Sequence, residues 1–100
     1  MKEQIKDLIC QELNQAKSKN PPFSSSHEGW AVLLEEIEEL TTEINHIKQV
    51  NEQLWNHVRI NDAQGQQEAV DKIYLTAINT VCEAIQVAAM ALKFSEMLKG

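Results

Sequence analysis

Apolar side chains recur along the chain at spacings of three and four residues, which is the period of an α-helix. Within residues 2 to 18 they are Ile5, Leu8, Ile9, Leu13 and Ala16. Asn20-Pro21-Pro22 ends this first helix, because the residue before a proline avoids the α region. Ser25, with Glu28 three residues later, predicts a capping box at the start of a second helix.

Two long helices follow, and each carries a 4-3 seam of the kind used in helical bundles. The second helix is expected from about residue 27 to residue 60, with its seam at Leu33, Ile37, Leu40, Ile44, Ile47, Asn51, Leu54 and Val58. Residues 61 to 67 are expected to form a turn. The third helix is expected from about residue 67 to residue 98, with its seam at Val70, Tyr74, Ala77, Val81, Ala84, Ala88, Ala91, Ser95 and Leu98.

The third helix is apolar on a second side as well, at Val87, Met90 and Phe94. A helix that is apolar on more than one side is buried on more than one side. One hundred residues supply too few neighbours for this, so we expect a homo-oligomer, a dimer or a tetramer, with this helix at its centre. The expected fold class is all-α: a single domain over residues 1–100, in which two long antiparallel helices and an N-terminal helix form a bundle that oligomerisation completes.

Composition narrows the function classes. The net charge of -6 argues against a nucleic-acid partner, because phosphate backbones are bound by basic surfaces. Cys10 and Cys82 form no CxxC pair, so neither a disulfide framework nor a zinc site is indicated. The N-terminus lacks the pattern of a signal peptide, and the longest apolar run, residues 87–92, is too short to span a bilayer. We therefore expect a cytoplasmic protein without a membrane partner.

The stretch from Leu34 to Leu40 holds four glutamates, with no lysine or arginine between Glu28 and Glu43. Like charges three and four residues apart destabilise a helix, so this face either meets open water or holds a cation. Antiparallel packing could set Glu36 and Glu39 opposite a similar pair on the third helix, Glu83 and Gln86. Oxygen ligands from facing helices are a known way to bind Mg²⁺ in a bundle. Spacing alone leaves both the solvated face and the metal site open.

Two runs, Ser26 to Leu40 and Cys82 to Ala91, resemble the MazG-like branch of the all-α nucleoside triphosphate pyrophosphohydrolases, most of all its short phage- or prophage-type members. The metal motif of that family is EExxE followed by ExxD. The stretch from Glu35 to Glu39 matches the first part, and the stretch from Glu83 to Gln86 matches the second except at its last position.

The resemblance implies hydrolysis of a nucleoside triphosphate to the monophosphate and pyrophosphate, with Mg²⁺, or Mn²⁺ in its place, as cofactor. The metal ligands would be Glu36, Glu39 and Glu83, with Gln86 where an aspartate is expected. Glu35 and Glu36 would be the catalytic carboxylates, which hold the attacking water. The neutral Gln86 and the long segment between the two motifs, residues 40 to 82, depart from the family pattern.

Three further residues are candidates for contact with the nucleotide, each with a plainer alternative. Trp30 either stacks on the base or packs within the fold. Lys72 either pairs with phosphate or is a solvated charge, and Asn79 lies one turn before Glu83. Two other functions stay open: a catalytically inactive MazG-like protein that acts in assembly or partner binding, and a coiled-coil adaptor, which would explain the seams but not Glu83.

Overall fold

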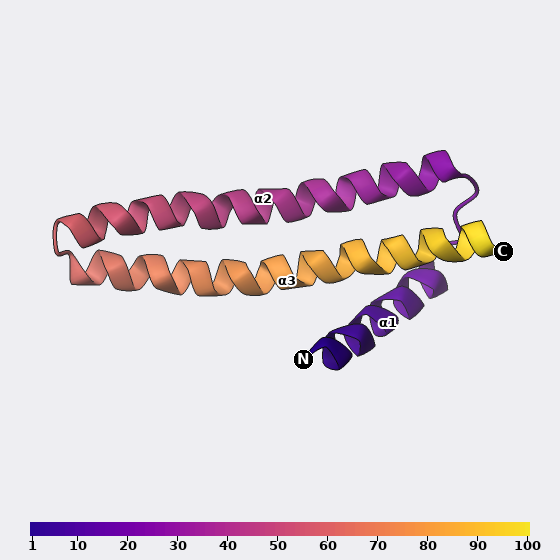
Figure 1. The fold of residues 1–100 in the computed structure, drawn as a ribbon, viewed down its shortest axis with the longest axis horizontal. Helices are drawn as coiled ribbons and strands as arrows, with labels where there is room; N and C mark the ends of the chain where they lie inside the picture. Colours follow the sequence, from indigo (N-terminus) through magenta and orange to yellow (C-terminus); the bar gives the residue numbers. More distant parts are fainter.

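The computed structural model describes all 100 residues as three helices with no strand. They are α1 (Lys2–Lys19), α2 (Ser26–Arg59) and α3 (Ala63–Lys99). As Figure 1 shows, α2 and α3 form a long antiparallel hairpin, and α1 lies across the C-terminal half of α3. The prediction of an all-α fold with two long antiparallel helices and an N-terminal helix is thus confirmed.

The helix boundaries follow local chemistry. Asn20, before the two prolines, is extended, with φ -134° and ψ 146°, so α1 stops where predicted. The Ser25 hydroxyl accepts a hydrogen bond from the Glu28 N–H at 3.1 Å, which confirms the predicted cap of α2. The Glu28 carboxylate reaches back to Ser24, whose hydroxyl lies 3.1 Å away.

The turn between α2 and α3 is shorter than the predicted 61–67. The α3 helix begins at Ala63 because the Asp62 carboxylate caps it, accepting the Gly65 N–H at 3.0 Å. This bond, together with a 3.0 Å contact to His57 Nδ1, holds the pKa of Asp62 below its usual value. Asn61 has a positive φ of 56°, which reverses the chain direction within three residues. The prediction of a turn over residues 63–67 was therefore wrong.

The hairpin buries a stripe that includes half of the predicted seam of α2: Leu33, Leu40, Ile47 and Leu54 are half-buried. From Glu36 onward, the buried and half-buried side chains along α2 are Glu36, Leu40, Glu43, Ile47, Val50, Leu54 and His57. The matching series on α3 consists of Ala69, Ile73, Thr76, Thr80, Glu83, Val87, Met90 and Phe94, and further residues near its C-terminal end are buried by α1. The other half of the predicted α2 seam is exposed, including Ile37, Ile44 and Val58, and so is most of the predicted α3 seam, including Val70, Tyr74 and Val81.

The best-packed part of the molecule lies where α1, the connection to α2 and the end of α3 meet. Leu13, Phe23, Ala89 and Met90 form a small buried cluster there. The rings of Phe23 and Phe94 meet edge to face, with centroids 6.3 Å apart. Only 10 of the 100 residues are buried, so most of the hairpin has no core beneath it.

Replacing Gly29 by alanine is expected to destabilise the fold by about 1 kcal/mol, and so to lower the melting temperature by roughly 4–8 °C. The new Cβ would lie against the ring of Phe94, 2.9 Å from Cγ and closer still to Cδ2. This overpacking outweighs the better helix propensity of alanine. Thermal unfolding followed by circular dichroism measures the change. In a Phe94→Leu background the same substitution should cost clearly less; an equal cost would contradict the packing explanation.

Candidate metal centre

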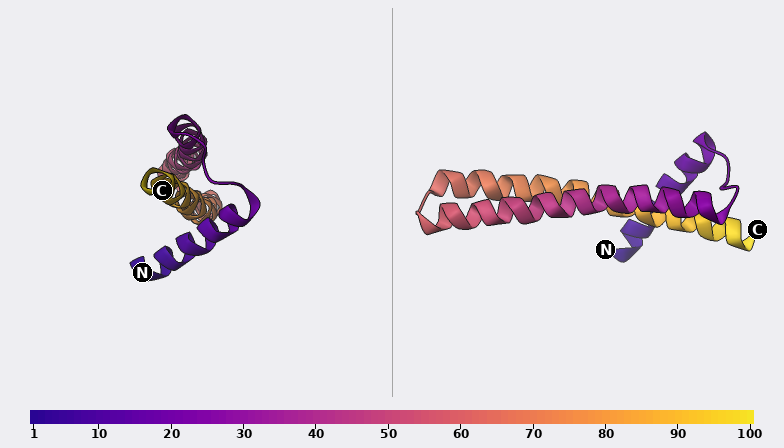
Figure 2. Two further views of the ribbon diagram at one scale, coloured as in Figure 1. Left: turned by 90° about the vertical axis from the view of Figure 1, so that its right-hand side faces the viewer. Right: turned by 90° about the horizontal axis from the view of Figure 1, so that it is seen from above.

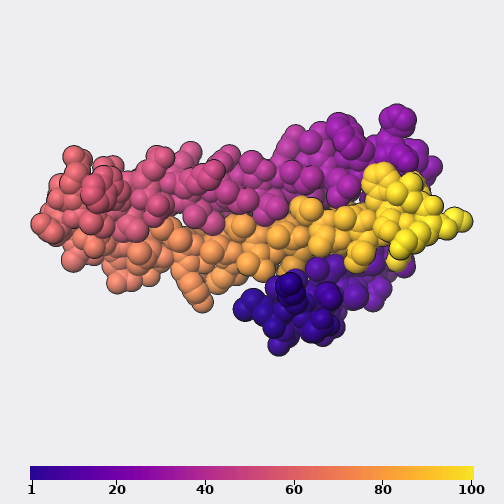
Figure 3. Space-filling view, in the orientation of Figure 1, coloured from indigo at the N-terminus to yellow at the C-terminus, as the bar shows by residue number.

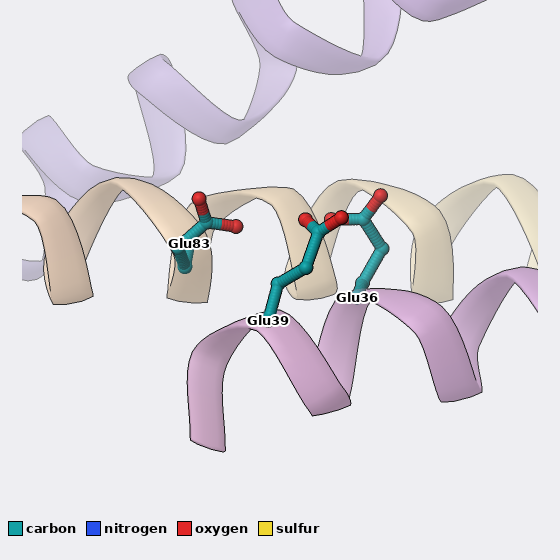
Figure 4. Close-up of side chains that lie close together, drawn as sticks. All are labelled: Glu36, Glu39 and Glu83. Carbon is teal, nitrogen blue, oxygen red and sulfur yellow. The ribbon is translucent and has the colours of Figure 1, made fainter. Parts of the chain in front are cut away.

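Three carboxylates from the two long helices converge midway along the hairpin. Glu36 and Glu39 come from successive turns of α2, and Glu83 comes from the facing turn of α3. One carboxylate oxygen from each lies within 4.8 Å of the others. Figure 4 shows the three side chains reaching toward one another between the helices. The hairpin therefore brings together three of the four residues expected to bind a metal.

The local geometry explains this convergence. Residues three apart on a helix lie about 60° apart around its axis, so Glu36 and Glu39 project from one side of α2. Glu36 belongs to the buried stripe of α2 and Glu83 to that of α3, and both side chains are half-buried, whereas Glu39 is exposed. A carboxylate at a helix–helix contact is costly to bury without a partner of opposite charge.

The electrostatics of the cluster are those of crowded like charges. Burial, together with the negative charges of Glu39 and Glu83, raises the pKa of Glu36 above its ordinary value of 4.5. Burial and the charges of Glu39 and Glu43 likewise raise the pKa of Glu83. No lysine or arginine forms an ion pair with any of the three glutamates. A bound cation would supply the missing positive charge.

Besides Glu35, the neighbour of Glu36 in the sequence, two further carboxylates act on the cluster. Glu43 acts on Glu83 from the next turn of α2, and Glu12 acts on Glu36 from α1. The position of Glu43, four residues after Glu39, could have indicated this role. No sequence signal could have found Glu12, because only the crossing of α1 over α3 brings it close. These two charges compensate in part for the neutral Gln86.

Gln86 is half-buried and lines an open groove of about 480 Å³. The groove lies between α1, the loop after it and the two long helices, and Glu36 and Gln86 form its border with the acidic cluster. Its other walls include Glu12, Phe23, Val32, Met90 and Lys93. The amine of Lys93 lies 4.4 Å from the centre of the Phe23 ring, a cation–π contact that positions it in the groove wall.

The other residues predicted for the site are exposed and lie outside the cluster. Glu35 directly precedes Glu36, so its side chain leaves α2 about 100° away from that of Glu36. Trp30 is 63% exposed, and the nine residues that separate it from Glu39 place the two on opposite sides of α2. Lys72 lies 11 residues before Glu83, a distance of about 16 Å along α3. Of the four, Glu35 acts on the cluster, because its charge adds to the rise in the pKa of Glu36, and Asn79 lies one turn before Glu83 on α3.

The donor set suits a hard divalent cation. Oxygens on opposite sides of Mg²⁺ are about 4.2 Å apart, and on opposite sides of Ca²⁺ about 5 Å apart. Carboxylate oxygens spaced up to 4.8 Å apart need shifts of less than about 1 Å to ligate either ion. The exposed side chain of Glu39 is free to make such a shift.

No protein family model matches the chain, and no similar curated protein or solved structure is found.

Proposed function

We propose that this protein is a Mg²⁺-dependent nucleoside triphosphate pyrophosphohydrolase, which releases the monophosphate and pyrophosphate. The observation that carries the proposal is the convergence of Glu36, Glu39 and Glu83 beside an open groove. The two segments that resemble the MazG-like enzymes, in α2 and α3, are the segments that supply these three glutamates. A solvated charged face would give no reason for Glu36 and Glu83 to lie at the contact between the helices.

In this proposal each residue has a distinct task. Glu36, Glu39 and Glu83 hold the metal, and the amide oxygen of Gln86 is an additional, weaker ligand. The metal would neutralise charge on the phosphate oxygens. Glu36 would also help to hold the attacking water, the role that the resemblance to the MazG-like enzymes implies for it. Glu35, exposed on the next position, would help to orient that water.

The groove offers a place for the nucleotide next to the metal. Its border with the cluster is formed by Glu36 and Gln86, so a ligand in the groove would reach a cation held there. Lys93, two turns beyond Gln86 on the α3 wall of the groove, would pair with phosphate oxygens. Lys72, which we expected in this role, lies too far along α3 to act on the same phosphates.

Calorimetric titration with Mg²⁺ and Mn²⁺, together with a pyrophosphate-release screen over the common nucleotides, tests the proposal. Binding in the millimolar range or tighter, with turnover of at least one nucleotide, is expected. Absence of metal binding at millimolar concentration would exclude the function. Metal binding without turnover would instead favour the alternative, an inactive protein of the same type that acts in assembly.

The Gln86→Asp variant is expected to bind Mg²⁺ roughly ten-fold more tightly, a gain of about 1.4 kcal/mol. Position 86 borders the acidic cluster, so a carboxylate there would add one negative charge to the ligand set. Titration of wild type and variant under the same conditions measures the gain. Gln15→Glu, which adds a charge in the groove wall on α1, is the matched control and should have a smaller effect. Equal effects would show that position 86 does not ligate the metal.

A further inference from the structure

An exposed apolar stripe runs the length of α2 on the flank of the hairpin. Its positions follow an unbroken 4-3 spacing: Trp30, Leu34, Ile37, Thr41, Ile44, Lys48, Asn51, Trp55 and Val58. Six of the nine are large apolar residues, each between 38% and 63% exposed. Such a regular apolar series is typical of a surface that packs against another helix.

A matching stripe lies on α3. It consists of Val70, Tyr74, Ala77, Val81 and Ala84, all exposed. On each helix the stripe is rotated by about 100° in the same sense from the side that faces its partner. In an antiparallel pair, equal rotations in the same sense lie on the same side, so the two stripes form one surface. We call these fourteen residues the apolar flank; Lys48 is the only charged residue among them.

The rest of the chain reaches the apolar flank only at Val81 and Ala84, which line a small apolar hollow with Ile5 and Ile9 of α1. In Figure 2, left, which looks along the hairpin, α1 passes beneath α3 and the connection to α2 rises on one side, while on the other side only the N-terminal end of α1 projects, below α3. Figure 3 shows the long sides of α2 and α3 uncovered except where α1 reaches the C-terminal half of α3. The acidic residue Glu39 lies opposite Trp30 on α2, so the flank and the metal ligands occupy different sides.

The accessible area indicates how large the missing partner surface is. The chain exposes 7267 Å². A compact monomer of 11.4 kDa is expected to expose about 5,800 Å². The excess of about 1,500 Å² per chain lies within the range of roughly 1,000–2,500 Å² that each partner of an obligate homodimer buries. The radius of gyration of 17.7 Å, against about 13 Å for a compact domain, reflects the same open shape.

We propose that a second copy of this chain packs on the apolar flank, so that two hairpins form a four-helix bundle with both acidic clusters facing outward. Side chains at 4-3 spacing form holes that accept the side chains of a facing helix. The small residues Thr41, Ala77 and Ala84 allow that helix to approach closely. The flank draws on α2 as much as on α3, whereas the sequence pattern placed α3 alone at the centre.

A lipid bilayer is the competing occupant. The length and composition of α3 would allow it to cross a membrane. The core helix of a soluble bundle can have the same length and composition. Burial in hydrocarbon would carry Glu83 with it, at a cost of about 2.5–3.5 kcal/mol on insertion scales. Lys48 and Asn51 also interrupt the middle of the flank, where a partner helix can accommodate them more readily than lipid can.

Sedimentation equilibrium of the full chain, combined with tryptophan quenching, tests this assembly. We expect twice the chain mass of 11.4 kDa, or a pair of such dimers, at micromolar concentration. Both tryptophans of the protein lie in the flank, so iodide should quench their fluorescence weakly in the assembly and strongly after dilution to the monomer. A single-chain mass with freely quenched tryptophans would overturn the proposal, as would a monomer that binds neutral phosphatidylcholine vesicles.

Two matched variants locate the interface. Ile44→Lys, in the flank, should weaken association roughly 100-fold. Ile60→Lys adds the same charge at a 66% exposed position just after α2, outside the apolar flank, and should leave the mass unchanged. Equal effects of the two variants would overturn the proposal. If Ile44→Lys fails to fold, the wild-type melting temperature decides: it must rise with protein concentration if the fold depends on a second copy.

The Glu36→Gln variant separates this surface from the proposed activity. The substitution alters the acidic cluster, which lies outside the apolar flank. The mass of the assembly formed by this variant should therefore equal that of the wild-type assembly.

Discussion

Glu36→Gln is expected to reduce magnesium-dependent pyrophosphate release by at least about 100-fold and yet to raise the melting temperature of the metal-free protein by roughly 4–8 °C. Both effects have one cause. Glu36 lies beside Glu39 and Glu83 at the contact between two helices, where burial and then the repulsion from these two charges raise its pKa. Glutamine keeps the shape of the side chain, removes the repulsion and removes the charge that would bind the cation.

Glu38→Gln is the matched control for this experiment. It makes the same chemical change two residues away, at an exposed position outside the cluster of three. Its activity and its melting temperature should stay close to those of the wild type. If Glu36→Gln loses stability, or if Glu38→Gln loses as much activity as Glu36→Gln, the cluster is not the metal centre.

The metal-free protein is expected to lose stability as the pH rises above about 4.5, and Mg²⁺ is expected to restore it at neutral pH. The folded-state pKa values of Glu36 and Glu83 both lie above the ordinary value of 4.5. Between 4.5 and these raised values the folded protein binds more protons than the unfolded chain, so the free energy of unfolding falls as pH rises. The stabilising contribution is complete below pH 4.5 and lost once the pH exceeds the raised pKa values.

Asp62 acts in the opposite direction and in a different pH range. Its pKa is held below 3.8 by the Gly65 N–H and His57, so its contribution is present above pH 3.8 and is lost as the pH falls through its lowered pKa. The two effects therefore occur in different pH ranges. A pH below 3.8 weakens the cap of α3, whereas a pH above 4.5 increases the repulsion within the acidic cluster.

Melting curves from pH 4 to pH 8, with and without Mg²⁺, measure these shifts. At a concentration one hundred times its dissociation constant, Mg²⁺ would stabilise the folded state by about 2.7 kcal/mol, an increase of roughly 10–20 °C in the melting temperature. The Glu36→Gln variant should show a flatter pH profile and a much smaller Mg²⁺ effect. A metal-free stability that rises from pH 5 to pH 7, or an absence of any Mg²⁺ effect, would contradict the electrostatic account.

Much of the fold was determined by interactions close in sequence. Proline and the Ser25 cap set the end of α1 and the start of α2, because such effects depend on residues one to four positions apart. The 4-3 periodicity fixed three helices and an antiparallel hairpin. The same period placed Glu36 and Glu39 on one side of α2, so that their approach to Glu83 could be predicted before the structure was known.

Tertiary structure decided which of two neighbouring series on each helix lies inside. The sequence offers Ile37 and Ile44 as readily as Glu36 and Glu43, and hydrophobicity alone favours the isoleucines. In the hairpin the glutamates lie at the helix contact and the isoleucines lie on the flank. Packing between distant segments sets this rotation, and so does the position of α1, which brings Glu12 near Glu36. Periodicity defines the stripes of a helix, but only its neighbours determine which stripe they cover.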